Sequence, residues 1–262
     1  RVMQSGDGGK PYVELLAILM AGWALGSMNA GLISGTLSLI VRDLGLSPEE
    51  AGRVLSSWLL GMLFGAFAMG VVGDKWGRKA AAALSLTLMG LFSAASAVSR
   101  GWLDLSAYRV LAGVGSAGYM VVASTLMSEY APTAIRGRMV AILESAWALG
   151  WLASLILARL VAPVMGWRPV FLASLATLAL VPVVMVRVPE SLRFLISMGK
   201  LEEARSLAAR IGAELPRGAG PSKVPLSTLF RGKYARRTLM LWTHWFCIVL
   251  AYWGIFLWLP HI

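Results

Sequence analysis

The sequence predicts an all-α membrane protein, and its composition is the first observation behind this prediction. Of the 262 residues, 58% are hydrophobic and only 14% are charged, and the mean hydropathy is +0.71. Water-soluble domains are roughly 45–50% apolar and about 25% charged, so this composition excludes a soluble globule. The single cysteine, Cys247, excludes an intrachain disulfide framework.

Seven charge-poor apolar segments are the second observation. Each is long enough to cross hydrocarbon about 30 Å thick as a helix, which pairs all of its backbone polar groups internally. The predicted spans are 15–41, 54–73, 80–99, 110–128, 139–158, 169–186 and 238–260. Only the fifth of them carries a charge, that of Glu144.

The distribution of basic residues is the third observation, and it predicts the orientation. With the N-terminus in the cytoplasm, the cytoplasmic segments hold all but six of the 24 lysines and arginines. This asymmetry follows the positive-inside rule, so we expect a multi-pass protein of the cell membrane (plasma or inner) with a cytoplasmic N-terminus. The net charge of +11 then reflects topology, and we expect no nucleic-acid partner.

The longest segment outside the predicted spans, 187–237, divides by composition. Apolar residues recur at helical spacing over 201–211, which predicts a short amphipathic helix in the cytoplasm, and a linker rich in proline and glycine follows it. We therefore divide the chain into a six-helix transmembrane bundle (1–186), a cytoplasmic linker containing the short helix (187–237) and a seventh transmembrane helix (238–262).

The turn between the second and third spans, residues 70–79, reads Gly-Val-Val-Gly-Asp-Lys-Trp-Gly-Arg-Lys. The first glycine would let a neighbouring helix approach, and the last would permit a tight turn. The acid and the arginine can form charge-assisted bonds that break when helices rock apart, whereas the positive-inside rule alone explains only the lysines. We interpret this segment as a gate turn, with the residues Gly70, Asp74, Gly77, Arg78 and Lys79.

Three further motifs lie at the ends of predicted spans. Arg109-x-x-x-Gly113-x-Gly115 begins the fourth span, a charged segment from Glu129 to Arg138 joins the fourth to the fifth, and Pro-Glu-Ser-x-Arg follows the sixth at 189–193. In this order and on these membrane sides, together with the gate turn, they resemble the sugar-porter and organic-ion branches of the major facilitator superfamily over residues 13–262.

The resemblance implies a specific architecture: the N-terminal six-helix bundle of that fold, built from two three-helix repeats, followed by the first helix of the C-terminal half. The missing C-terminal half of the same transporter is then a partner. It also implies that a cytoplasmic charge network, together with the gate turn, holds one conformation closed. Exposed ion pairs contribute only ~0–1 kcal/mol each, so a single pair could not hold that conformation and a network would be needed. Its expected members are Glu129, Arg136, Arg138, Glu190 and Arg193.

Residues 113–118 also match the dinucleotide fingerprint G-x-G-x-x-G. That fingerprint requires a preceding strand and a helix start for the pyrophosphate, whereas these glycines lie inside an apolar span. We interpret Gly113, Gly115 and Gly118 as helix-packing residues.

Glu144 is the acidic residue within a predicted span. An ionisable side chain there costs at least ~2.5–3.5 kcal/mol, so it should face a cavity or a partner, and we expect it to couple transport to protons. The resemblance places it where sugar porters carry a cavity-facing glutamine that binds substrate. The alternative is a structural pair near the cytoplasmic interface. Trp147 and Trp151 follow on the same helical face and could line the same cavity.

Two polar residues of other spans are also assigned to the substrate or proton pathway. Asn29, at mid-depth in the first span, needs a partner either on another helix or on a ligand. Arg109 lies near the outer end of the fourth span, where it could extend to the interface. In sugar porters the matching arginine pairs with an aspartate of the first span, which this chain lacks, and a substrate carboxylate could replace it.

Aromatic residues complete the predicted pathway. Tyr252 and Trp253 lie in the last span, which lacks the glutamine-rich run typical of sugar porters, and this favours a flatter, more apolar substrate. Tryptophans at span ends are mostly interfacial anchors, so we assign Trp102, Trp167 and Trp258 no function.

Together these observations predict a secondary active transporter. It would move a small organic solute, such as an organic acid or similar metabolite, across the lipid bilayer by alternating access and proton-coupled symport. A sugar or polyol transporter, or a membrane sensor or scaffold that kept this fold, remain alternatives. The sequence offers no nucleophile, metal cluster or phosphate loop, so we expect no enzyme, no metal and no cofactor besides the proton.

Overall fold

The computed structural model describes residues 11–211 and 226–258, and within these ranges every regular element is a helix. Contacts divide the chain into two units, Arg1–Arg217 and Gly218–Ile262, which are described separately. The first unit contains α1 (Pro11–Leu44), α2 (Pro48–Trp76), α3 (Arg78–Ala95), η1 (Ser96–Val98), α4 (Trp102–Tyr130), α5 (Arg136–Met165), α6 (Trp167–Leu172), η2 (Ala173–Leu175), α7 (Ala176–Arg187), α8 (Leu192–Ser197) and α9 (Leu201–Ile211). The second contains η3 (Leu226–Phe230) and α10 (Gly232–Trp258).

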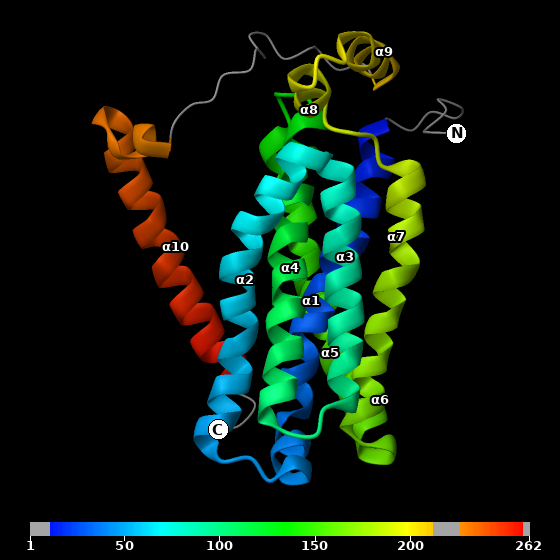
Figure 1. Cartoon of the computed structure of the whole chain (residues 1–262), viewed down its shortest axis with the longest axis vertical. Helices are drawn as coiled ribbons and strands as arrows, with labels where there is room; N and C mark the ends of the chain where they lie inside the picture. Colours follow the sequence, from blue (N-terminus) through cyan, green and yellow to red (C-terminus); the bar gives the residue numbers. More distant parts are fainter. Residues whose placement is uncertain (1–10, 212–225, 259–262) are drawn as a thin grey trace. The chain divides into compact units, whose positions relative to one another are not determined.

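Six helical stretches of the first unit are long and apolar enough to cross a membrane, and they run side by side as one bundle (Figure 1). The sixth, Trp167–Arg187, joins α6, η2 and α7 without a break. This confirms the prediction of an all-α membrane protein. The predicted seventh span, 238–260, lies within α10 as far as residue 258, and its last two residues are outside the described part of the chain.

Local sequence explains where two of these helices begin. At α2, the Ser47 side chain accepts from the Glu50 amide at 3.2 Å, and the Glu50 carboxylate accepts from the Ser47 amide at 2.8 Å. This reciprocal capping satisfies two amides that the helix leaves free. At α4, the Asp104 carboxylate accepts from the amides of Arg100 and Gly101, at 2.6 and 2.9 Å.

The broadest helix interfaces of the bundle join α2 to α4 and α1 to α5. These pairs correspond if α1–α3 and the stretch from α4 to α7 are two copies of one three-helix unit. Glycines allow both close approaches: a Cβ at Gly61 would lie 2.0 Å from the Val110 carbonyl oxygen, and one at Gly150 would lie 1.8 Å from that of Ala24. Any larger residue would push these backbones apart.

The three glycines of α4 face α2 and α3. A Cβ at Gly113 would lie 2.3 Å from the Trp58 carbonyl oxygen of α2, and one at Gly115 would lie 2.5 Å from the Ser85 carbonyl oxygen of α3. A Cβ at Gly118 would lie 2.3 Å from the side chain of Met69. These glycines therefore let α4 lie in the centre of the bundle, against both neighbours.

Two faces of the bundle expose large apolar side chains. On α2 these are Leu60, Leu63, Phe64, Phe67 and Val71. On α5 they are Leu149, Leu152, Ile156, Leu160 and Val164. Each set repeats at helical spacing, and continuous apolar faces of this kind suit hydrocarbon or further helices rather than water.

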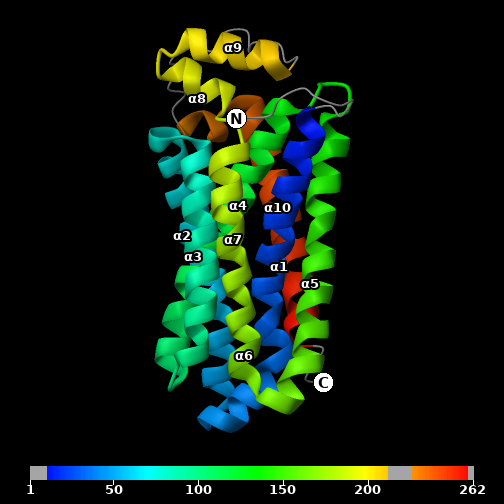
Figure 2. The ribbon, with the colours of Figure 1, turned by 90° about the vertical axis from the view of Figure 1, so that its right-hand side faces the viewer.

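The segment after α7 lies across one end of the bundle, where α8 and α9 cap it (Figure 2). Ala204 and Ala208 of α9 are buried, while Glu202, Glu203 and Arg205 are exposed. The side chains of α9 that the structure describes, 201–209, thus make the helix amphipathic. The bundle end that carries the gate turn and α8 is called the gate end below.

Candidate functional site

The gate turn is built around a glycine that no other residue could replace without strain. Gly77 ends α2 with φ 98° and ψ 155°, a conformation that only glycine adopts readily. The carboxylate of Glu190 fills the space beside it, because a Cβ at Gly77 would lie 2.2 Å from Glu190 Oε2. Figure 1 shows that α2 and α3 meet in this turn next to α8.

Glu190 binds the start of α3 through backbone amides. Its Oε1 accepts from the amides of Arg78 at 2.7 Å and Lys79 at 3.2 Å, and from its neighbour Ser191 at 2.8 Å. The first amides of a helix have no partner within the helix and carry partial positive charge, so a carboxylate is stabilised there. Glu190 therefore joins the segment after α7 to the α2–α3 turn.

The end of α4 joins the same cluster. Tyr130 donates its hydroxyl proton to the carbonyl oxygen of Glu190, and the Ser191 hydroxyl donates to Glu129 Oε2 at 2.6 Å. Ser191 Oγ also accepts from the Phe194 amide at 3.1 Å, which caps α8. The turn between α2 and α3, the end of α4 and the linker segment thus meet in this cluster.

The charged residues of the gate end differ in their contacts. Arg78 forms an ion pair with Asp74 and donates to the Gly70 carbonyl oxygen at 3.4 Å. A Cβ at Gly70 would meet nothing within 4 Å, so in the described part of the chain no helix approaches there, and close helix approach at Gly70 stays a prediction for the complete transporter. Within the same part, no carboxylate lies within ion-pair distance of Arg136, Arg138 or Arg193.

Arg109 lies in the core of the bundle. It is 1% exposed and donates to the carbonyl oxygens of Asn29 at 2.9 Å and Ala30 at 3.2 Å in α1. Its guanidinium lies 4.2 Å from the centre of the Trp58 ring, a cation–π contact that partly offsets the cost of burial. The expectation that Arg109 extends to the interface is therefore wrong, and in this structure the side chain is closed to a substrate carboxylate.

Asn29 is fully buried beside this arginine. Its Nδ2 donates to the Thr177 hydroxyl of α7 at 3.0 Å. The sequence left open whether Asn29 would bind another helix or a ligand, and in the structure it binds another helix. Asn29 Oδ1 and Arg109 Nε are buried without a partner in the described residues. The pair therefore ties α1 to α4 and α7 from within.

The three predicted pathway residues of α5 do not share one environment. Glu144 is exposed, Trp147 is half-buried with its carbonyl oxygen accepting from the Ser27 hydroxyl, and Trp151 is buried. A Cβ at Gly31 of α1 would lie 3.3 Å from the Trp151 ring, so this tryptophan packs against α1. Glu144 points away from the interior of its own bundle.

The aromatic residues of the last span belong to the second unit. Tyr252 is half-buried within α10, and the side chain of Trp253 lies outside the described part of the chain. Within the described residues, no group of three or more His, Cys, Asp or Glu side chains could hold a metal ion.

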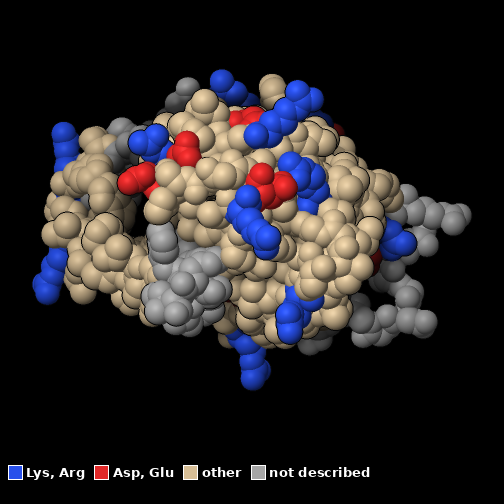
Figure 3. Space-filling model, turned by 90° about the horizontal axis from the view of Figure 1, so that it is seen from below, with Lys and Arg blue, Asp and Glu red and all other residues tan. Residues whose placement is uncertain are grey.

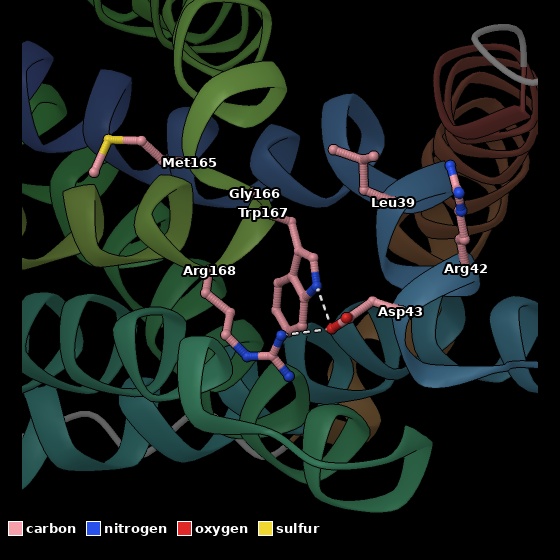
Figure 4. Close-up of a pocket in the computed structure, with 7 residues that line it drawn as sticks. All are labelled: Leu39, Arg42, Asp43, Met165, Gly166, Trp167 and Arg168. Carbon is pink, nitrogen blue, oxygen red and sulfur yellow. Dashed lines mark hydrogen bonds and ion pairs between the residues drawn. The ribbon is translucent and has the colours of Figure 1, made fainter.

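At the end of the bundle opposite the gate end, Asp43 connects α1 to α6 (Figure 4). Its Oδ2 accepts from Trp167 Nε1 at 3.0 Å and pairs with the Arg168 guanidinium, which also donates to the Ser99 carbonyl oxygen at 3.3 Å. Sequence reasoning missed this cluster and treated Trp167 as a membrane anchor. No periodic signal links residues 43 and 168, which lie 125 positions apart.

Known proteins resemble the chain over most of its length. A sequence profile of the Major Facilitator Superfamily matches residues 18–262. The niacin transporter NiaP of Acinetobacter baylyi is 37% identical over 97% of this chain and 60% of its own length. The 4-hydroxybenzoate transporter PcaK of the same species is 32% identical over 84% of this chain and 51% of its own length.

Solved structures share the fold. A proton:xylose symporter, XylE, bound to 6-bromo-6-deoxy-D-glucose matches with a TM-score of 0.69 at 22% identity, over 77% of this chain and 50% of XylE. XylE from E. coli in a partially occluded inward-open conformation matches with a TM-score of 0.70. The chain spans about half to three-fifths of the length of such proteins. From the profile and the relatives together, the chain belongs to the Major Facilitator Superfamily, whose members are transporters and not enzymes.

Proposed function

We propose that this chain forms the N-terminal part of a secondary transporter for a small aromatic carboxylic acid. The observation that carries the proposal is the 37% identity to a niacin transporter across 97% of the chain. Relatives named for 4-hydroxybenzoate, gallate and benzoate transport align over 84–86% of it. All four named solutes combine one planar ring with one carboxylate, which agrees with the flat, apolar substrate expected from the sequence.

The gate end supports a mechanism of alternating access. Glu190 connects the linker segment to α3, and Tyr130 and Glu129 add the end of α4 to the same cluster. These contacts are hydrogen bonds, each of which contributes little free energy and is weak enough to break and re-form during a conformational change. We propose that this cluster holds the cytoplasmic side closed in one state, with the N-terminus in the cytoplasm.

Proton coupling is the finer part of the proposal, and Glu144 is its candidate carrier. Glu144 is exposed on α5 of the isolated first unit, on the side that leaves the bundle interior. In the complete transporter this side would face the path between the two halves, where a carboxyl group can exchange protons with water from either side of the membrane.

The test uses the full-length protein in liposomes. Counterflow of labelled nicotinate would show transport, whereas a sensor or scaffold would show none, and xylose in the same assay tests the sugar alternative. With an inward proton gradient, the native protein should accumulate nicotinate above equilibrium.

Glu144→Gln should then lower gradient-driven accumulation by about tenfold and leave counterflow within about twofold, because exchange needs no net proton movement. Ser145→Ala, a change at the exposed neighbouring position, is the matched control and should keep both activities. Equal accumulation by Glu144→Gln and the native protein would remove Glu144 from the coupling step without affecting the transport proposal.

A further inference from the structure

The end of the bundle opposite the gate end contains a basic hollow between α1 and the α5–α6 turn. Its volume is about 460 Å³, and it is open to the outside. Figure 3 views this end and shows basic and acidic side chains lying among one another. The hollow is lined by Leu39, Arg42, Asp43, Met165, Gly166, Trp167 and Arg168.

The charges around the hollow do not cancel. Asp43 is committed to Arg168 and Trp167, so it neutralises one of the two arginines (Figure 4). Arg42 is exposed, and in the described residues no carboxylate lies within ion-pair distance of it. One net positive charge therefore remains among the residues that line the hollow.

The depth of the hollow in the membrane distinguishes between possible anions. Its basic residues lie at the last turn of α1 and the first turn of α6, which is where a membrane-spanning bundle meets the lipid headgroups. Below Arg42 and Arg168, the end of α5 exposes an apolar strip: Leu160 is 70% exposed, Val164 84% and Met165 65%. This arrangement matches a phospholipid, which has a charged headgroup at the membrane surface and hydrocarbon chains deeper in the bilayer.

A soluble aromatic acid fits the hollow less well. The Trp167 ring is only 3% exposed, and Arg168 already covers it at 4.5 Å, so no free aromatic face is left for stacking. From the net positive charge, the depth and the adjoining strip, we propose that this hollow binds the headgroup of an anionic phospholipid, with the phosphate on Arg42 and an acyl chain along the exposed end of α5.

The proposal is tested by native mass spectrometry of the detergent-purified full-length protein with dioleoylphosphatidylglycerol or dioleoylphosphatidylcholine. The native protein should retain the anionic lipid about fivefold more than the zwitterionic one, since one basic residue near a membrane surface contributes a factor of this size. Arg42→Ala should abolish that preference. Arg42→Lys should keep most of it, because a point charge suffices for a phosphate.

Two further variants separate the site from general surface charge. Arg159 is also an exposed arginine, but it lies on α5 and does not line the hollow. Arg159→Ala should therefore retain the full preference for phosphatidylglycerol. Asp43→Asn should raise retention of phosphatidylglycerol by about twofold or more, because it frees Arg168 for the phosphate. A purely structural role of Asp43 would instead leave retention unchanged or lower it.

Three results would overturn the proposal. Arg42→Ala could retain phosphatidylglycerol as well as the native protein, or Arg159→Ala could lose as much of it as Arg42→Ala, which would indicate diffuse attraction. Inorganic phosphate in large excess could displace the lipid, which would indicate a free-anion site. Because Arg42 is exposed and has no ion-pair partner in the described residues, its substitution should leave the thermal unfolding temperature unchanged, and this is measured alongside.

Discussion

At each end of the bundle a carboxylate connects two elements, but the donors that the two carboxylates bind differ in kind. At the gate end, Glu190 accepts from backbone amides of Arg78 and Lys79. At the opposite end, Asp43 accepts from the side chains of Trp167 and Arg168. Amides at a helix start cannot turn away from their acceptor, whereas an exposed guanidinium can rotate into water.

This difference indicates that backbone geometry determines the contact at the gate end and that charge determines the contact at the opposite end. The gate end depends on the backbone shape of the turn, because the carboxylate of Glu190 fills the space that a side chain at position 77 would need. The opposite end depends on an ion pair whose side chains are 44% and 46% exposed. We therefore expect substitutions at the gate end to have larger effects, and effects that depend less on salt.

The largest effect is expected for Gly77→Ala. A non-glycine residue in this backbone conformation costs about 1–3 kcal/mol, and the new methyl group would also displace the Glu190 carboxylate. Both the thermal stability of the full-length protein and its nicotinate counterflow should fall, the latter by about tenfold or more.

Gly52→Ala is the matched control, since position 52 lies inside α2 and a Cβ there would meet nothing within 4 Å. It should be neutral or stabilise by up to about 1 kcal/mol, because alanine favours helix more than glycine does. If both alanine variants had the same stability and counterflow, the backbone conformation of the gate turn would not be what determines the effect of substitutions at the gate end.

The next largest effect is expected for Glu190→Ala. Removing this carboxylate leaves the first amides of α3 without their acceptor, which costs about 1–3 kcal/mol where the amides stay shielded from water. Glu190→Gln keeps one acceptor oxygen and should lose roughly half as much. Reversible unfolding in mixed detergent micelles measures both values.

The exposed Glu203 of α9 provides the control, and Glu203→Gln should change stability by less than about 0.5 kcal/mol. If Glu190→Gln were as harmful as Glu190→Ala and its effect disappeared in 1 M salt, the charge of Glu190 would matter through distant arginines rather than through backbone amides.

The fold could be predicted from the sequence because hydrocarbon imposes strict requirements on a chain. Long apolar runs must be helices, and the turn at 70–79 with its glycines and charges indicated the family before any coordinates. The candidate site was less predictable. The family resemblance placed Glu190 in a charge network, but only the folded turn shows that its oxygen reaches backbone amides.

Buried polar residues were the least predictable part. A sequence shows that Arg109 needs partners but not that two α1 carbonyl oxygens supply them. Backbone carbonyls inside a helix give no residue-level signal, because every residue has one. The same limit applies to Asp43 and Arg168, whose pairing depends on two helix ends meeting in space.

The smallest effect is expected for Asp43→Asn at the end opposite the gate end. The amide oxygen of asparagine can still accept from Trp167, and only the attraction to Arg168 is lost, so the free energy of unfolding should fall by about 0–1 kcal/mol. The difference should vanish near 1 M salt, where the Debye length is about 3 Å. A loss above about 2 kcal/mol that persists in salt would show that this end is tied as rigidly as the gate end, and the contrast between the two carboxylates would then fail.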